Sequence, residues 1–424
     1  MIHPSLRPDH LRPSLRFGLP GAVTLAILSF SPVSHSLPVA CTEDDCPPGG
    51  GGGGAGSPPP VTTDVGVIRE LGATCPGETV EIYMDDEDDD NENDRSGWMG
   101  DVDDYRNTRI RFCKVSGQSF RALVGAAGNS SKHYAVLQLG TACPNGSVSF
   151  SRYFDDEDND NQDLMSGPYS PNSYTRSNPS GSTWNFCLFD GSSAAQGSMS
   201  TWPSLGLQYG VFAPAGFTQS VGGGAGGLGF VYTDDEDDDN QNHYSSSPIS
   251  ATSIVSDGPN TLLRMAKVSG TPARVNSRED DVGPGYWMTS VVQYGLNGAV
   301  RGYTKLSNWN DLTSFEGHVF LVFLDSSQHP VWITSSHSWA AGYSLFTSPD
   351  QARNSWDETL PAIVRSKVKG FAVVQEDYLP CDFDQHFSNR ELVSGWSDPV
   401  FQQYSDPGYV DWMMARTASA KTMW

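Results

Sequence analysis

The sequence predicts a mainly β protein made of tandem, disulfide-stapled, sandwich-like repeat units, and three observations carry that prediction. The chain contains 44 Gly and 28 Pro, and no segment keeps a helical period of apolar residues beyond a turn or two. Short runs of alternating apolar residues recur, with turn residues about every 8–12 positions, as in β-sandwiches. Three near-identical acidic strings, at 85–91, 155–161 and 234–240, mark copies of one longer pattern.

Each acidic string lies inside a longer repeat. Units 1 and 2 open with Leu-Gly-x-x-Cys-Pro, at 71–76 and 139–144, and close on Phe-Cys. Unit 3 keeps the closing strand but has Ala266 where the cysteine falls. The clearest strands are 109–115, 133–139, 148–153, 262–268 and 319–324, the last forming a hairpin with 331–334.

These patterns divide the chain into segments. They are a signal peptide (1–40), a Gly/Pro-rich tether (41–63), repeat units at 64–134, 135–205 and 206–290, a degenerate fourth unit without an acidic string (291–376) and a C-terminal extension (377–424). The pattern leaves open whether the units are separate domains or share one larger β core.

The N-terminus predicts export from the cell. Arg7, Arg12 and Arg16 precede an apolar run at 19–30, which is too short and too interrupted to remain as a membrane span. Cys41 then follows small residues and precedes the tether, and in this it looks like the lipid-attachment cysteine of bacterial lipoproteins. The expected location is therefore extracellular or in the bacterial cell envelope, with the membrane reached only through a lipid at Cys41. Plain secretion is the alternative.

The seven cysteines fit this compartment. Two cysteines appear together in units 1 and 2 and are both missing from unit 3, which predicts the bonds Cys75–Cys113 and Cys143–Cys187. If Cys41 carries a lipid, Cys46 and Cys381 remain as a third pair. If it does not, Cys41 pairs with Cys46 instead.

The negative charge of the chain is concentrated. The formal net charge is −24, and the three strings hold 17 of the 50 acidic side chains. General surface acidity would be spread over the chain, so the clustering favours a local role for these carboxylates. Nucleic acid is excluded as a partner, because phosphate binding requires a basic surface.

The strings carry the ligand chemistry of a calcium site. In every copy Asp occupies alternate positions, Asn follows, and a further Asn or Asp comes two residues later, which supplies hard oxygen ligands at regular spacing. The predicted ligands are Asp86, Asp88, Asp90 and Asn93 in unit 1, Asp156, Asp158, Asp160 and Asp163 in unit 2, and Asp235, Asp237, Asp239 and Asn242 in unit 3.

Over about eight residues per copy, this pattern resembles the first half of an EF-hand or thrombospondin-type calcium loop. It then departs from the EF-hand, because Gly97, Gly167 and Ser246 stand where a bidentate Glu belongs. Another segment must complete the shell, and in unit 1 Asp101, Asp103 and Asp104 are candidates. Magnesium suits the pattern less well, since it demands tighter octahedral geometry. The structural alternative is a solvated acidic loop that keeps a sheet edge soluble.

The predicted function is a calcium-binding adhesion or ligand-binding protein of the cell surface, whose partner is an extracellular glycan or protein. Units 1–3 would form a stalk and the segment from 291 onward a binding head. The sequence contains none of the hydrolase or phosphate-binding motifs sought, so an enzyme is the less favoured class. The alternative is a glycan-directed envelope hydrolase with its site in the C-terminal half. The tryptophans whose exposure bears on sugar stacking are Trp98, Trp184, Trp287, Trp332 and Trp339.

Overall fold

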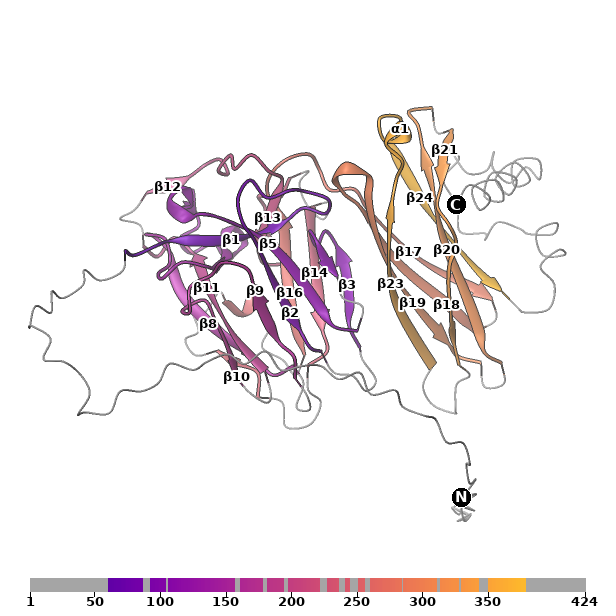
Figure 1. The fold of residues 1–424 in the computed structure, drawn as a ribbon, viewed down its shortest axis with the longest axis horizontal. Coiled ribbons are helices and arrows are strands. Elements are labelled where there is room, and N and C mark those ends of the chain that lie inside the picture. The colour runs from indigo at the N-terminus through magenta and orange to yellow at the C-terminus, as the bar shows by residue number, and fades with distance from the viewer. Residues whose placement is uncertain are drawn as a thin grey trace, which may run out of the picture. The chain divides into compact units, whose positions relative to one another are not determined.

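Of the residues that the structure describes, 53% lie in strands and 6% in helices, which confirms the predicted β class (Figure 1). The computed structural model describes residues 60–378, except 87–91, 104–105, 157–160, 178–180, 194–196, 222–226, 236–240, 245–250, 256–259, 284, 311–312, 328 and 343–349. The predicted signal peptide, nearly all of the tether and of the C-terminal extension, and Cys41, Cys46 and Cys381 lie outside this range. Within it, no helix is both long and apolar enough to cross a membrane.

Whereas the end of unit 3, from Val275 onward, belongs to a separate sheet, a 14-stranded sheet takes strands from all three units with acidic strings. Its strands are β1 (Asp64–Arg69), β2 (Thr79–Met84), β3 (Asp94–Gly97), β4 (Val102–Asp103), β5 (Thr108–Ser116), β7 (Tyr134–Gln138), β8 (Val148–Phe154), β9 (Leu164–Ser166), β10 (Tyr174–Ser177), β11 (Gly181–Phe189), β13 (Tyr209–Phe212), β14 (Leu228–Thr233), β15 (His243–Tyr244) and β16 (Thr261–Lys267). A separate two-stranded sheet pairs β6 (Ala122–Leu123) with β12 (Ser198–Met199). Short 3₁₀ turns lie at η1 (Gly117–Ser119), η2 (Ser130–Lys132) and η5 (Ala251–Ser253).

The first strands of the three units pair with one another. β1 pairs with β7, β7 with β13, and β13 with β1, which closes a ring of three. Each of these strands also pairs with the closing strand of its own unit, and that strand pairs in turn with the strand that leads into the acidic string. The three units therefore form one larger β structure and are not separate domains.

The strand that follows each acidic string crosses to a neighbouring unit. β3 of unit 1 pairs with β14 of unit 3, β9 of unit 2 with β2 of unit 1, and β15 of unit 3 with β8 of unit 2. The exchange is cyclic, so each unit completes the sheet of another. Because of this exchange, the ends of the three acidic strings contact each other's units.

Alternating side chains give the sheet two packed faces. In β2, Val80, Ile82 and Met84 are buried while the residues between them are more exposed, which is the period-2 pattern of a strand with one core face. One core cluster contains these three residues together with Trp98 and Trp184. A second cluster lies around β1, β7 and β13 and contains cysteines of both disulfides.

Both predicted disulfides are present. Cys75 bonds Cys113 and Cys143 bonds Cys187, and each joins the opening of a unit to its closing strand. The bonds span 38 and 44 residues of sequence. On the chain-entropy model, loops of this length contribute roughly 3–4 kcal/mol each to the free energy of unfolding.

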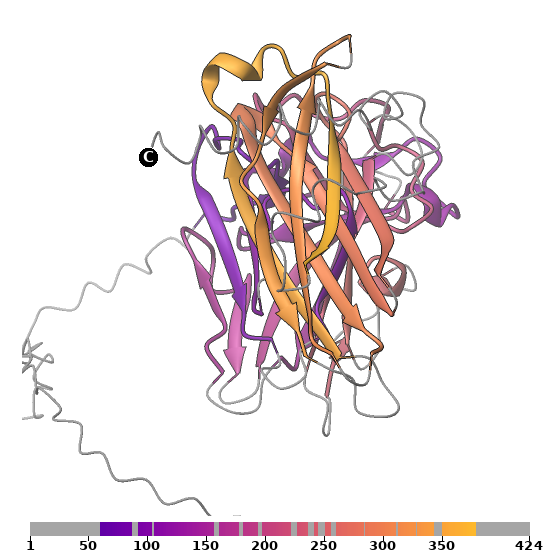
Figure 2. The same ribbon diagram turned by 90° about the vertical axis from the view of Figure 1, so that its right-hand side faces the viewer.

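Residues 275–378 form two further four-stranded sheets, whose strands run side by side in Figure 2. The first has the order β17 (Val275–Gly283), β18 (Tyr286–Tyr294), β19 (Ala299–Asn308) and β23 (Asp350–Thr359). In the second, β20 (Phe315–Leu324) pairs with β21 (Pro330–Ile333), β22 (His337–Ala341) and β24 (Gly370–Tyr378). A short helix, α1 (Ala362–Arg365), and a 3₁₀ turn, η6 (Leu296–Gly298), lie in the connections.

These two sheets pack on each other as a sandwich. One core cluster takes residues from both, and the Tyr286 and Phe315 rings stack across it with centroids 4.8 Å apart. The predicted hairpin of 319–324 and 331–334 is confirmed, with Val322 opposite Ile333. The other strands that the sequence marks most clearly are confirmed as well, as β5, β7, β8 and β16.

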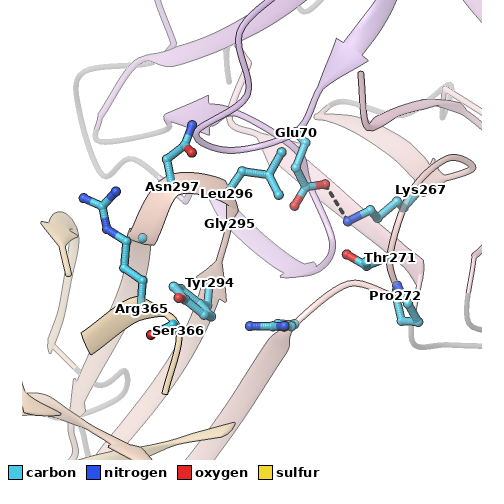
Figure 3. A pocket seen from close by; sticks show the side chains of 12 residues that line it. Glu70, Lys267, Thr271, Pro272, Tyr294, Gly295, Leu296, Asn297, Arg365 and Ser366 are labelled. Atoms are coloured by element: carbon cyan, nitrogen blue, oxygen red, sulfur yellow. Dashed lines mark ion pairs between the residues drawn. The ribbon is translucent and has the colours of Figure 1, made fainter. Parts of the chain in front are cut away.

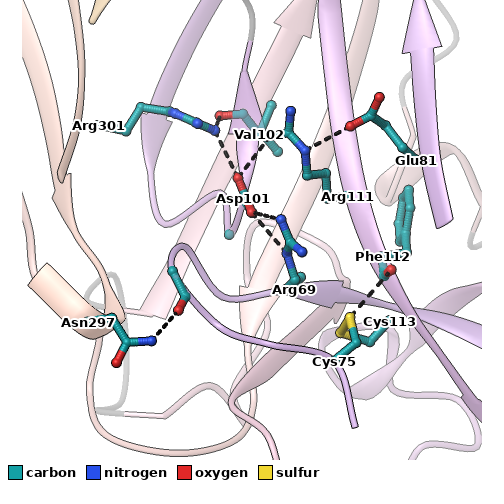
Figure 4. A network of polar contacts seen from close by, with 12 residues as sticks. Arg69, Cys75, Glu81, Asp101, Val102, Arg111, Phe112, Cys113, Asn297 and Arg301 are labelled. Carbon is teal, nitrogen blue, oxygen red and sulfur yellow. Dashed lines mark hydrogen bonds and ion pairs between the residues drawn. A yellow bond between two sulfur atoms is a disulfide. The ribbon is translucent and has the colours of Figure 1, made fainter. Parts of the chain in front are cut away.

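An arginine cluster joins the sandwich to the 14-stranded sheet (Figure 4). Asp101 accepts hydrogen bonds from Arg69, Arg111 and Arg301, the last from β19. Gly100 has φ +68°, and a Cβ there would lie 2.5 Å from the carbonyl oxygen of Arg69, so the turn that presents Asp101 requires glycine. Asp101 is therefore committed to arginine and does not complete a calcium shell.

Candidate metal centre

The second Asp of each acidic string is buried. Asp86, Asp156 and Asp235 follow β2, β8 and β14 and are at most 1% exposed. With Asn93, Asp163 and Asn242 they make up what we call the acidic ring. The other predicted ligands, Asp88, Asp90, Asp158, Asp160, Asp237 and Asp239, lie outside the described residues.

Side chains that follow one string hold the backbone of another. The three contacts are cyclic, like the strand exchange: the amide of Asp85 donates to Oδ1 of Asp163 (2.8 Å), that of Asp155 to Oδ1 of Asn242 (3.2 Å), and that of Asp234 to Oδ1 of Asn93 (2.7 Å). Each sequence-predicted ligand after a string thus contacts a different unit from its own.

A second set of hydrogen bonds joins the same pairs of units, with the donor and acceptor units exchanged. The backbone amides of Gln162, Gln241 and Glu92 donate to Oδ2 of Asp85, Asp155 and Asp234, at 2.8, 2.7 and 2.5 Å. The first Asp of each string is therefore a cross-link between units. This role is structural and needs no metal.

The buried carboxylates of Asp86 in unit 1 and Asp235 in unit 3 accept hydrogen bonds from equivalent residues. Oδ2 of Asp86 accepts from Asn93 (2.7 Å) and Thr108 (2.6 Å). Oδ2 of Asp235 accepts from the equivalent Asn242 and Thr261, at 2.6 and 2.5 Å, and Thr233 donates to its Oδ1 at 2.9 Å.

Unit 2 breaks the pattern because Asp163 replaces the asparagine. An ionised carboxylate cannot donate a hydrogen bond to Asp156. Both oxygens of Asp156, Oδ2 of Asp163 and Oδ1 of Asp86 are buried and have no hydrogen-bond partner among the described residues, although the nearby Ser182 hydroxyl lowers the pKa of Asp163. Buried carboxylate oxygens are costly to leave unpaired, so these four atoms require protons or a cation.

Burial and mutual repulsion raise the pKa values of the ring. Burial is the largest cause at Asp86, Asp156 and Asp163, and the neighbouring carboxylates raise the pKa of Asp86 and Asp156 further. Burial also raises the pKa of Asp235, to about 7, against hydrogen bonds from Thr261 and Asn242.

One internal cation partly offsets this charge. Arg152 is fully buried, donates from Nη2 to Thr261 Oγ1 (3.1 Å), and lowers the pKa of Asp235. Its guanidinium also lies 5.3 Å from the ring centroids of Phe154 and Tyr244. Arg152 thus compensates the unit 3 corner of the ring, whereas Asp156 faces mainly other carboxylates.

The donor set suits a hard cation. All six ring residues offer carboxylate or amide oxygen, which calcium prefers. In the part of the chain that the structure describes, no group of three or more His, Cys, Asp or Glu side chains is arranged to hold a metal ion directly. The unpaired oxygens of the described ring are the atoms from which a coordination shell would have to be built.

The sequence prediction did not include a tyrosine that lies two residues before the first Asp of each string. Tyr83 and Tyr153 donate to the first Asp of their strings, at 3.2 and 3.0 Å, and Tyr232 occupies the same position in unit 3. The shared string is therefore Tyr-x-Asp-Asp. An alignment that began two residues earlier would have shown it.

The raised pKa values predict that the calcium-depleted protein becomes more stable as pH falls from about 7 toward 4. The folded state binds more protons than the unfolded state in this window, because burial raises the pKa of the ring carboxyls above the ordinary Asp value of 3.8. Urea unfolding of dialysed protein at pH 5 should give a higher midpoint than at pH 7.5. A midpoint that is equal or higher at pH 7.5 would contradict the ring electrostatics.

Residues 60–194 match the family described as Bacterial ApeC, which is less than half of the chain. The match covers β1–β11, both disulfides and two of the three acidic strings. The third corner of the acidic ring and the sandwich lie beyond it. No curated protein matches the chain.

Proposed function

We propose that the protein is an extracellular binding protein whose three-unit sheet is stabilised by calcium at the acidic ring. The observation that carries the proposal is the set of four buried carboxylate oxygens, on Asp86, Asp156 and Asp163, that have no described donor. Two disulfides support an oxidising, extracellular location.

The position of the ring explains what calcium would do. The ring residues come from all three units, and each hydrogen-bonded corner joins two of them. A cation would remove the repulsion at the point where the units interlock. It would thereby stabilise the whole sheet, since a ligand that binds only the folded state shifts unfolding by mass action.

Ligand binding is best supported on the sandwich. Trp98 and Trp184 are fully buried, and Trp332 and Trp339 pack partly buried against the sandwich core. Trp287, by contrast, is 40% exposed, and Trp309, which the sequence did not single out, is 56% exposed.

The two exposed indoles lie at the paired ends of two strands, since Trp287 is the second residue of β18 and Trp309 directly follows β19. The amide of Trp309 donates to the carbonyl of Gly285, two residues before Trp287. Exposed aromatic side chains of this kind offer apolar faces for a sugar ring or for a protein side chain. We therefore place recognition of a glycan or protein ligand at this end of the sandwich.

The envelope hydrolase gains no specific support. Acidic groups of the sandwich serve as partners of basic side chains: Asp357 pairs with Arg301, and Glu358 with His337.

A glycan and polymer array probed with the intact mature chain tests the ligand site. The Trp287→Ala/Trp309→Ala variant should lose binding at least about tenfold, because a hot-spot aromatic contributes about 2 kcal/mol or more. Leu164→Ala, which removes a 55% exposed apolar side chain from β9, is the matched control and should bind normally. Retained binding in the double-tryptophan variant would place recognition elsewhere.

A further inference from the structure

A cavity of about 360 Å³ lies between the end of β16 and the β18–β19 turn, and none of the six residues of the acidic ring lines it (Figure 3). Its polar and charged lining includes Glu70, Lys267, Thr271, Arg274, Arg365 and Ser366. The volume falls at the lower end of the range for small-molecule sites, about 300–1,000 Å³. A ligand the size of one sugar unit fits such a cavity.

Two of the four charged side chains in this lining neutralise each other. Lys267 Nζ lies 3.0 Å from Glu70 Oε2, and both side chains are at most 3% exposed. The indole of Trp98 also donates to Glu70 Oε2, at 2.7 Å. This pair belongs to the core, and its charges are not available to a ligand.

The two arginines of the lining remain as net positive charge. Among the described residues, neither Arg274 nor Arg365 lies in an ion pair. The guanidinium of Arg274 lies 5.3 Å from the centroid of Tyr294, and Arg365 Nε donates to the carbonyl of Leu360 (2.7 Å). Both contacts fix the direction of the side chain and leave terminal N–H groups for a partner.

This arrangement is unusual for the chain. The formal net charge is −24, and several other arginines are paired with acids, as Arg69, Arg111 and Arg301 are with Asp101. Two unpaired guanidinium groups in one cavity therefore form a local site of positive charge. Guanidinium recognises carboxylates and phosphates through paired N–H donors.

Hydroxyl groups complete the lining. Thr271 and Ser366 are exposed at the cavity, and Asn297 is anchored by its Nδ2, which donates to the carbonyl of Gly72 at 2.8 Å. Such groups suit the hydroxyls of a sugar, while the arginines suit an acidic substituent on it.

We propose that this cavity binds the oxyanion of a small hydroxylated molecule, such as a carboxylated or phosphorylated sugar unit, with Arg274 and Arg365 holding the anion. The site is distinct from the exposed tryptophans and requires no calcium. It goes beyond the proposed function, and its failure would leave the calcium proposal untouched.

Calorimetric titration of the intact mature chain in calcium-free buffer tests the proposal, with glucuronate, glucose 6-phosphate and glucose as probes. At least one acidic sugar should bind while glucose does not, and added sulfate should compete. Binding by glucuronate alone identifies the anion as a carboxylate, and binding by glucose 6-phosphate alone identifies it as a phosphate. If neither acid binds, or if glucose binds as tightly as they do, the proposal is overturned.

Two variants and a control assign the residues. Arg274→Gln and Arg365→Gln should each weaken binding at least about tenfold, which corresponds to 1.4 kcal/mol. Lys367→Gln makes the same charge change on an exposed side chain that does not line the cavity, and it should bind as the parent does. Equal weakening by Lys367→Gln would show a general charge effect, and this too would overturn the proposal.

Discussion

Replacing Asp101 by Ala is expected to lower the free energy of unfolding by about 3–5 kcal/mol, because it leaves buried positive charge without its partner. Oδ2 of Asp101 accepts from Arg69 Nε at 2.9 Å, and Oδ1 accepts from Arg111 and Arg301 at 3.1 and 3.0 Å. The carboxylate is 6% exposed, and the three arginine side chains are at most 20% exposed. Urea unfolding gives the change directly.

Asp357→Ala is the matched control for this prediction. Asp357 pairs with the same Arg301, at 2.7 Å, but its side chain is 57% exposed. Solvent screens such a pair, so its loss should cost at most about 1 kcal/mol. Equal destabilisation of the two variants would show that the buried Asp101 ion pairs contribute no more to the free energy of unfolding than an exposed pair does.

The sign of the pH dependence at Asp101 is opposite to that of the acidic ring. Burial raises the pKa of Asp101, but Arg301 and Arg69 outweigh burial and lower it below 3.8. The stability that Asp101 contributes is present above that value and is lost as pH falls through its folded pKa. Acid should thus stabilise the depleted ring first and weaken the arginine cluster only at lower pH.

Asp156→Asn is expected to stabilise the calcium-depleted protein at pH 7.5 by about 1–3 kcal/mol, the cost of a buried group without partners. The amide carries no charge and can donate to Asp163, whose Oδ2 has no described donor. The same change removes a proposed ligand and should abolish the stabilisation by calcium. Few substitutions of a buried polar residue stabilise a protein, so the sign is diagnostic.

Asp281→Asn controls for the change in net charge. Asp281 lies in β17, is exposed, and accepts a hydrogen bond from the backbone of Gly283. Its replacement should leave both stability and the calcium response unchanged within about 0.5 kcal/mol. Destabilisation of the metal-free protein by Asp156→Asn would show that its carboxylate has a partner in the fold.

Local patterns in the sequence predicted much of this fold. The paired gain and loss of cysteines predicted both disulfides, since two residues that vary together within one chain are candidates for contact. Alternation in segments such as 109–115 predicted strands, because one face of each packs on a core. The alternate-Asp register contains Asp86, Asp156 and Asp235, which are buried, but the first Asp of each string is buried too, so burial does not distinguish the two registers.

The relations between units could not be predicted. Each string looks like a self-contained loop, yet the residue that follows it binds the next unit's backbone, as Asp163 does at Asp85. The exchange of β3, β9 and β15 depends on strand pairing over about 80 to 140 residues, which leaves no local signal. Asp101 was a candidate for the metal shell for the same reason, since its partner Arg301 lies 200 positions away.

The most direct test of the central claim is urea unfolding of the mature chain at pH 7.5, in chelator and in about 10 mM calcium. Extracellular calcium modules bind with dissociation constants of about 0.1–1 mM, so calcium should add about 1.4–2.7 kcal/mol to the free energy of unfolding. The gain should be absent in Asp156→Asn and intact in Asp281→Asn. Identical unfolding curves with and without calcium, or a gain that survives Asp156→Asn, would contradict a calcium site at the acidic ring.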